Sequence, residues 1–150
     1  MESIFKKETA QNYIDRIHQL TPQTQPQWGK MNVAQMLAHC QMPIKTATGE
    51  LVPKINPIVK LLFGKTAKKQ LVNDPEFKRN LPTFSEAKIV DQRIFEQERT
   101  KLVETIEAFQ QKGPAGLTKN AHPFFGEMTI GDWDLLQVKH LDHHLRQFGV

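Results

Sequence analysis

This 150-residue chain has one cysteine, one tyrosine and two tryptophans. The single cysteine, Cys40, cannot build an internal disulfide framework and suits a reducing compartment. No apolar run is long enough to span a bilayer, and the first residues lack the apolar segment of a secretory signal. These absences predict a cytoplasmic protein that has no membrane as a partner.

Strand-like alternation, internal repeats and low-complexity tracts are also missing. The length fits one domain over residues 1–150, with a core of useful size. A hydrophobic content of 39% and a charged content of 24% are ordinary for a globular protein, so composition indicates neither disorder nor a fibrous class.

Charge of one sign is concentrated in a single segment. Residues 53–80 hold seven Lys or Arg and two acidic residues, a net charge of +5. The remainder holds thirteen Lys or Arg and fourteen acidic residues, a net charge of −1. Nucleic-acid binders usually show a broader basic stripe with stacking aromatics, so no nucleic-acid partner is predicted. Two interpretations of the segment stay open, a solvated connection or an anion-attracting rim over a pocket.

Apolar residues recur at helical spacing in four places. The predicted helices cover roughly residues 3–20, 32–44, 86–112 and 129–147. Asn32 is a good N-cap, Pro43 is expected to end or kink the second helix, and Gly113 is expected to end the third. Asn56 followed by Pro57 permits a further helix within 53–80. The pattern predicts an all-α four-helix bundle.

Three histidines lie near the end of the chain, in the sequence KHLDHHLRQFGV. His140 and His144 are four residues apart, so both side chains rise from one helix face and flank its apolar stripe. His143 falls closer to the solvent side on the same helical wheel. Two imidazoles so placed can converge on one metal ion, but a catalytic site needs a third ligand from elsewhere.

His39 is the best candidate for that third ligand. It flanks the apolar stripe of the second helix, whereas His18 lies near an exposed helix end and His122 precedes a proline in a loop. Cys40 lies within the apolar stripe, where a buried and inert thiol is more common than a ligand. Spacing alone leaves an alternative open, because histidines are also favoured at helix C-termini by the helix dipole.

Two stretches resemble a known superfamily. WGKMNVAQMLAHC at 28–40 is similar to the second-helix signature of the DinB/YfiT-like metal-dependent bundles, and HPFFGEMTIGDWDLLQVKHLDHHLRQFG at 122–149 resembles the C-terminal signature of an uncharacterised branch. The resemblance implies an up-down-down-up four-helix bundle. It also implies a divalent metal held by His39, His140 and His144. Imidazole ligands leave the identity of this metal open among Zn²⁺, Ni²⁺ and Fe²⁺.

The resemblance further implies a chemistry. Some members of the superfamily use the metal to activate a low-molecular-weight thiol, such as bacillithiol, mycothiol or glutathione. We therefore expect a metal-dependent transferase or hydrolase that activates a thiol or water and acts on a small-molecule substrate. The alternative is a helical binding or scaffolding bundle whose metal site is vestigial or structural. An apolar bundle flank would also permit a homodimer.

Five more residues are candidates for the surroundings of the metal. His143 and Gln137 are one turn or less from a candidate ligand, Trp133 could wall a pocket, and His122 could cap the entrance. Glu98 is the sole candidate general base. Each has a structural alternative: a surface contact for His143, a bundle-edge amide for Gln137, core packing for Trp133, a turn for His122 and a compensating ion pair for Glu98.

Overall fold

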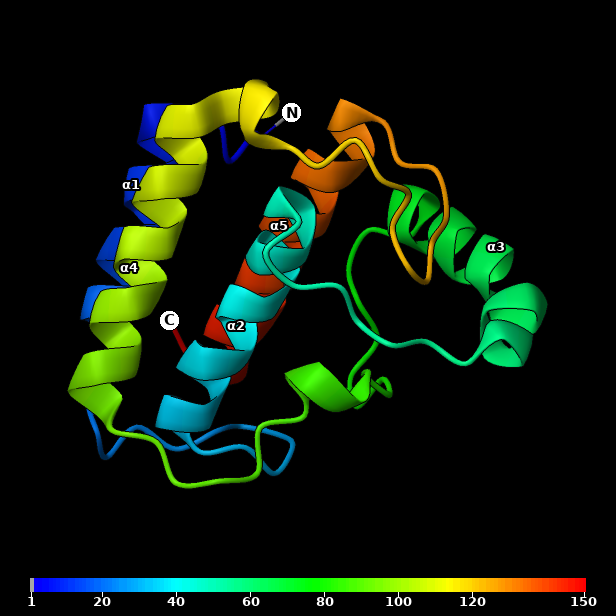
Figure 1. Ribbon diagram of the computed structural model, residues 1–150. Helices are drawn as coiled ribbons and strands as arrows, with labels where there is room; N and C mark the ends of the chain where they lie inside the picture. The colour runs from blue at the N-terminus through cyan, green and yellow to red at the C-terminus, as the bar shows by residue number, and fades with distance from the viewer. Residues whose placement is uncertain (1) are drawn as a thin grey trace.

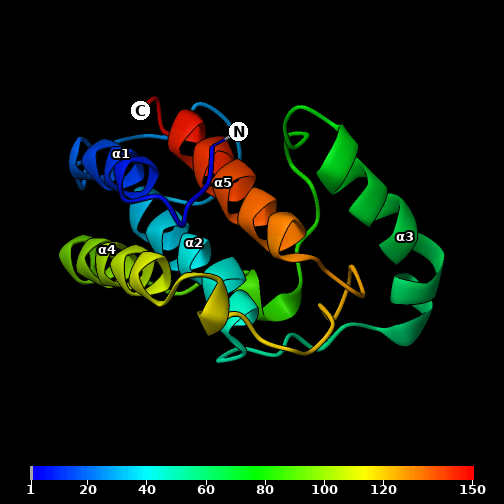
Figure 2. The ribbon, with the colours of Figure 1, turned by 90° about the horizontal axis from the view of Figure 1, so that it is seen from above.

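Four α-helices pack side by side, and a fifth lies against one flank of this group (Figures 1 and 2). The computed structural model describes residues 2–150. The helices are α1 (Lys7–His18), α2 (Val33–Thr48), α3 (Pro57–Asn73), α4 (Phe95–Lys112) and α5 (Ile130–Gln147), with short 3₁₀ helices at Ser85–Ala87 and Gly113–Gly116. No strand is formed within these residues, so the predicted all-α bundle is confirmed.

The direction of the four bundle helices follows a simple order. In Figure 1, α1 and α5 run downward whereas α2 and α4 run upward; with the view turned upside down, this is an up-down-down-up arrangement along the chain. Helix α2 contacts both α4 and α5, and α1 contacts the same two helices. The chain therefore closes a four-membered ring of helices around one core.

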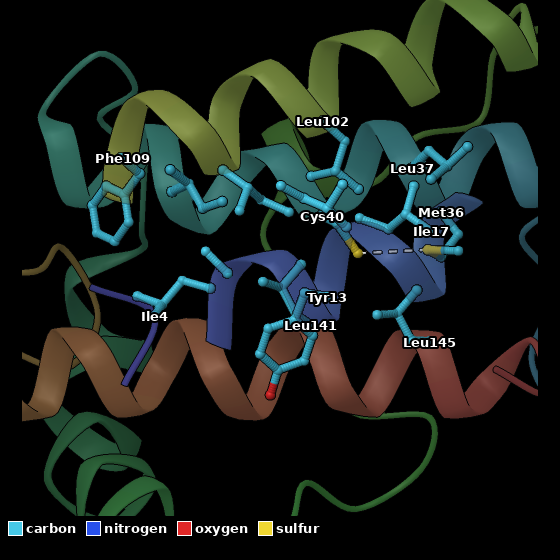
Figure 3. Close-up of a cluster of buried hydrophobic side chains, with 14 of the residues drawn as sticks. Ile4, Tyr13, Ile17, Met36, Leu37, Cys40, Leu102, Phe109, Leu141 and Leu145 are labelled. Carbon is cyan, nitrogen blue, oxygen red and sulfur yellow. Dashed lines mark hydrogen bonds between the residues drawn. The ribbon is translucent and has the colours of Figure 1, made fainter. Parts of the chain in front are cut away.

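The core is made by apolar stripes from all four bundle helices (Figure 3). Leu37 of α2, Leu102 of α4 and Leu141 of α5 are all at most 1% exposed. Burying one such side chain contributes about 1.5–3 kcal/mol. Cys40 lies among them, as expected, and its burial raises the pKa of the thiol. The cysteine is therefore part of the packing.

Helix starts follow the sequence signals. The Asn32 side chain accepts from the Gln35 backbone N–H at 2.9 Å, and Gln35 Oε1 accepts from the Asn32 N–H at 3.0 Å. Thr129 and Asp132 make the same reciprocal pair at the start of α5. Such capping boxes satisfy backbone donors that a helix start leaves free. They fix where the two histidine-bearing helices begin.

The predicted helix at 86–112 starts too early, since α4 begins at Phe95. Residues 85–87 form a 3₁₀ turn, and residues 88–94 that follow hold β-branched Ile89 and Val90, which favour extended backbone. The predicted first helix also starts too early, because Ile4 donates its N–H to Asp134 at 2.8 Å before α1 begins at Lys7.

The prediction for Pro43 was wrong in part. Helix α2 continues past it to Thr48 and ends at Gly49, whose φ of 80° is the left-handed conformation that favours glycine. A proline inside a helix lowers the stability of that helix. Beyond Pro43, however, Ile44 and Ala47 are only 1% and 0% exposed. Burial of these residues offsets the lost hydrogen bond, and the longer helix keeps α2 packed along α4.

Helix α3 forms where Asn56 and Pro57 permitted one. The Asn56 side chain accepts from the Ile58 N–H at 2.8 Å. Both views place α3 on the side of the bundle away from α1 and α4, next to α5 (Figures 1 and 2). None of the helices in residues 2–150 combines the length and hydropathy needed to cross a membrane.

Candidate metal centre

Three histidines converge between α2 and α5. His39 comes from α2, and His140 and His144 come from successive turns of α5; one ring nitrogen from each lies within 4.8 Å of the other two. The Nε2 atoms of His39 and His140 are 3.0 Å apart, and the three ring centroids are 4.6–4.8 Å from one another. The histidines singled out from the sequence therefore form one buried cluster that could hold a metal.

The neighbouring apolar residues fix the rotation of α5. Leu141 and Leu145, each 1% exposed, follow His140 and His144 by one residue and pack into the core. This leaves the histidines on the flank that faces α2, because adjacent residues differ by about 100° around a helix. The same reasoning applies to His39, which precedes buried Cys40.

Hydrogen bonds orient two of the rings. His39 Nδ1 lies 2.7 Å from the Ala87 carbonyl oxygen, which can only accept, so Nδ1 carries the proton. His144 Nδ1 lies 2.7 Å from Gln147 Oε1, and Gln147 Nε2 donates to the Trp28 carbonyl oxygen. In each neutral ring the remaining nitrogen, Nε2, is left with its lone pair for a ligand bond.

His140 differs from the other two ligands. Its Nδ1 is buried and has no hydrogen-bond partner in the described residues. With His39 Nε2 unprotonated, the 3.0 Å contact requires His140 Nε2 to donate its proton to His39. The alternative tautomer would free Nε2 for a metal and place the proton on Nδ1. His140 Nδ1, the ring nitrogen without a partner, therefore belongs to the ring that must change tautomer when a metal binds.

Burial keeps the cluster neutral. Desolvation lowers the pKa of all three histidines: that of His144 to about 3, with the charges of His39 and His143 contributing, and that of His140 well below its ordinary value. Metal binding requires neutral imidazole, and protonated histidines would repel one another at these distances. The centre is thus ready to bind a cation at neutral pH without first losing protons.

The donor set and its spacing fit a divalent transition metal. Two nitrogens bound to tetrahedral zinc at about 2.0–2.1 Å stand about 3.3–3.4 Å apart. The observed separations run from 3.0 Å to at most 4.8 Å, a range that includes this value. Three imidazoles also leave a coordination position open, as catalytic sites do.

His143 has a ring contact with the cluster. Its ring is 5.0 Å from that of His144, 5.7 Å from that of Trp28 and 6.2 Å from that of Phe77. It is half-buried and lies between the ligands and the aromatic residues of two loops. Its position suits packing that shields the ligands.

The other four candidates have partners elsewhere. Gln137 is buried and donates to the Pro43 carbonyl oxygen at 3.4 Å. Glu98 is 4% exposed and accepts from Gln41 at 2.8 Å and Lys101 at 3.2 Å. Burial raises the Glu98 pKa, but these donors outweigh it and lower the pKa overall. The carboxylate is thus held ionised between α2 and α4.

His122 and Trp133 pack against each other at the start of α5, with ring centroids 5.3 Å apart. His122 Nδ1 accepts the backbone N–H groups of Phe124 and Phe125, at 3.0 and 3.2 Å. Desolvation, followed by the Lys60 charge, lowers the His122 pKa to about 4. This histidine holds the loop that precedes α5.

Gln147 and the Ala87 carbonyl group are the contacts that sequence reasoning missed. Gln147 lies three residues after His144, a spacing at which helical side chains meet, so the sequence did hold a signal for it. Ala87 held none, because a backbone carbonyl 48 residues from His39 reaches it through tertiary folding alone. A cleft of about 340 Å³ lined by Trp28, Arg79 and Arg146 opens beside the Gln147 contact.

The chain belongs to the family described as "Protein of unknown function (DUF1569)", whose model matches residues 4–149. The match covers both histidine-bearing helices. Comparison with curated proteins and with solved structures found no match. The resemblance to the DinB/YfiT-like superfamily accordingly rests on the two sequence stretches alone.

Proposed function

We propose that this member of the DUF1569 family is a metal-dependent enzyme that activates a low-molecular-weight thiol or water for reaction with a small-molecule substrate. The observation that carries the proposal is the buried cluster of His39, His140 and His144, neutral and with Nε2 unprotonated on two of its rings. A divalent metal with an open position lowers the pKa of a bound thiol or water toward neutrality and so supplies a nucleophile.

The residues of the chain perform the positioning. His39, His140 and His144 would bind the metal, while the Ala87 carbonyl and the Gln147 amide hold two of the rings in place. Phe77 packs at the edge of the cluster, with its ring 6.5 Å from that of His140. Ligands oriented in this way favour a defined coordination geometry over loose metal binding.

The first experiment is elemental analysis of protein purified without chelator, beside a His144→Ala variant. We expect about one equivalent of Zn, Ni or Fe in the native chain and a loss of most of it in the variant. His18→Ala is the matched control, because His18 is exposed and lies outside the cluster. Absence of metal after incubation with each of these ions would refute the proposal.

A stability measurement separates a catalytic centre from a structural one. The core is built from apolar residues of four helices, so chelation should leave the helical content intact and lower the melting temperature modestly. Cooperative unfolding on chelation would instead identify a structural site, where metal binding supplies the folding free energy. In that case the scaffolding alternative would replace the enzyme.

A loaded centre can then be assayed with thiols and electrophiles. We expect turnover of an electrophilic substrate with bacillithiol, mycothiol or glutathione, or hydrolysis with water alone, which His144→Ala abolishes and His18→Ala preserves. The pH profile of kcat/KM gives a further check, since an activated thiol ionises below the range of a free one. Equal rates for His144→Ala and the native chain would show that the centre is not catalytic.

A further inference from the structure

Helix α3 carries more exposed large apolar side chains than any other helix of the described chain. Six of its large apolar side chains are 44–80% exposed: Ile58, Val59, Leu61, Leu62, Phe63 and Val72. Only Gly64 and Leu71 of its seventeen residues are buried. Single exposed apolar residues are common, but a contiguous group of this kind marks an interaction surface. Five of the six occupy the first two turns of the helix.

The attachments of α3 begin after that apolar stretch. A Cβ on Gly64 would lie 2.6 Å from the Phe124 carbonyl oxygen, so glycine permits close contact with the loop before α5. Lys68 pairs with Asp132 at 3.2 Å, and Lys139 donates to the Leu71 and Asp74 carbonyl oxygens. Residues 58–63 come before all of these contacts and project from the bundle.

The charge of α3 is entirely positive. Residues 57–73 contain four lysines and no acid. Lys65 and Lys69 follow Ile58 and Leu62 along the outward side, at helical spacings of seven residues. Both are exposed, and the ion pairs of residues 2–150 include neither. The outward side therefore consists of an apolar half followed by a cationic half.

We infer that α3 docks on an anionic phospholipid membrane, with residues 58–63 in the acyl boundary and Lys65 and Lys69 at the headgroups. Interfacial helices combine these two features, because binding draws on apolar burial and on attraction to anionic lipids together. A second copy of the chain is a poorer occupant, since pairing two α3 helices would bring eight lysines together without an acid between them.

This inference revises the sequence-based expectation that the protein has no membrane partner. That expectation rested on the absence of a spanning segment, and surface docking requires none. It is independent of the histidine centre, which lies between α2 and α5.

The test is sedimentation of the full chain with phosphatidylcholine vesicles and with vesicles containing phosphatidylglycerol. We expect binding to the anionic vesicles that weakens as salt rises, and a Lys65→Glu/Lys69→Glu variant that binds at least about 25-fold more weakly, at about fivefold for each lysine. Leu61→Ser/Leu62→Ser should lower binding about tenfold or more through lost apolar burial.

Val90→Ser is the matched control, since Val90 is 75% exposed and lies outside α3. It should bind vesicles as the native chain does. Absence of binding to anionic vesicles at low salt would overturn the inference, as would equal binding by native and variant chains. A dimer in solution that Leu61→Ser/Leu62→Ser converts to a monomer, without vesicle binding, would assign the surface to a second copy instead.

Discussion

Helices α3 and α5 are almost equal in length and lie next to each other, yet they relate to the fold in opposite ways. Helix α5 buries eight of its eighteen residues, including Leu141 and His144, whereas α3 buries two of seventeen. Helical spacing of apolar residues is regular in α5, and α3 is apolar around much of its circumference. The comparison shows that one helix is part of the core and the other is attached to it.

The location of the polar groups follows the same division. In α5 the histidines flank an apolar stripe and become buried with it, so packing determines both their position and their neutral charge. In α3 three of the four lysines remain in solvent with most of the apolar residues beside them, and Lys68 pairs with Asp132. A rigid site therefore belongs to α5, and a surface free to bind belongs to α3.

Truncating one leucine in each helix tests directly whether α5 belongs to the core and α3 does not. Leu141→Ala in α5 should lower the free energy of unfolding by about 2–5 kcal/mol, because it removes a buried side chain and leaves a cavity. Leu61→Ala in α3 should change it by no more than about 0.5 kcal/mol, since Leu61 is 80% exposed. Urea unfolding monitored by circular dichroism measures both. Equal losses would show that α3 belongs to the cooperative core.

The loop before α5, which contacts α3 at Gly64, offers a second test, through pH. Its His122 stays neutral in the folded protein down to a pKa of about 4, whereas an unfolded histidine takes up a proton near pH 6.5. The unfolded state then binds more protons between these values, so stability is complete above pH 6.5 and falls as the pH is lowered toward 4. The loss from this residue should be on the order of 2–3 kcal/mol.

His122→Asn measures that contribution. The Asn oxygen can accept from the Phe124 and Phe125 N–H groups, as Nδ1 does, but it cannot titrate. The free energy of unfolding, followed from pH 7 to pH 4.5 with chelator present, should fall less steeply in the variant. An unchanged slope would place the titration on other groups, such as the three clustered histidines.

The same contrast explains what the sequence could predict. Leu141 and Leu145 recur at helical spacing, so the orientation of α5 and its histidines followed from the pattern. The capping residue Asn32 similarly fixed the start of α2. Hydrophobic periodicity carries no information on features that tertiary contacts determine. One is the hydrogen bond between His39 and the Ala87 carbonyl group. Another is the continuation of α2 past Pro43, where burial outweighs the effect of a helix-breaking residue. It gave no orientation for α3 either, because apolar residues spread around a helix do not indicate which side packs against the bundle.

Gln147 lies at the end of α5, where the bundle meets the Trp28 loop. Its amide accepts from His144 Nδ1 and donates to the Trp28 carbonyl oxygen, and its own backbone carbonyl accepts from Gln27 at 2.8 Å. Gln147→Ala should weaken metal binding about 10–100-fold, because His144 loses the acceptor that fixes its tautomer and orientation.

Gln147→Glu separates that role from packing. A carboxylate also accepts from His144 Nδ1, so metal affinity should recover in this variant, although the Trp28 carbonyl oxygen loses its donor. Titration with Zn²⁺ in competition with a chelator gives the affinities, and chemical denaturation gives the stabilities. Recovery of affinity without recovery of stability would assign Gln147 two separable functions: holding the ligand through Oε1 and holding the loop through Nε2. Equal affinities for Gln147→Ala and the native chain would mean that core packing around α5 positions His144 without help.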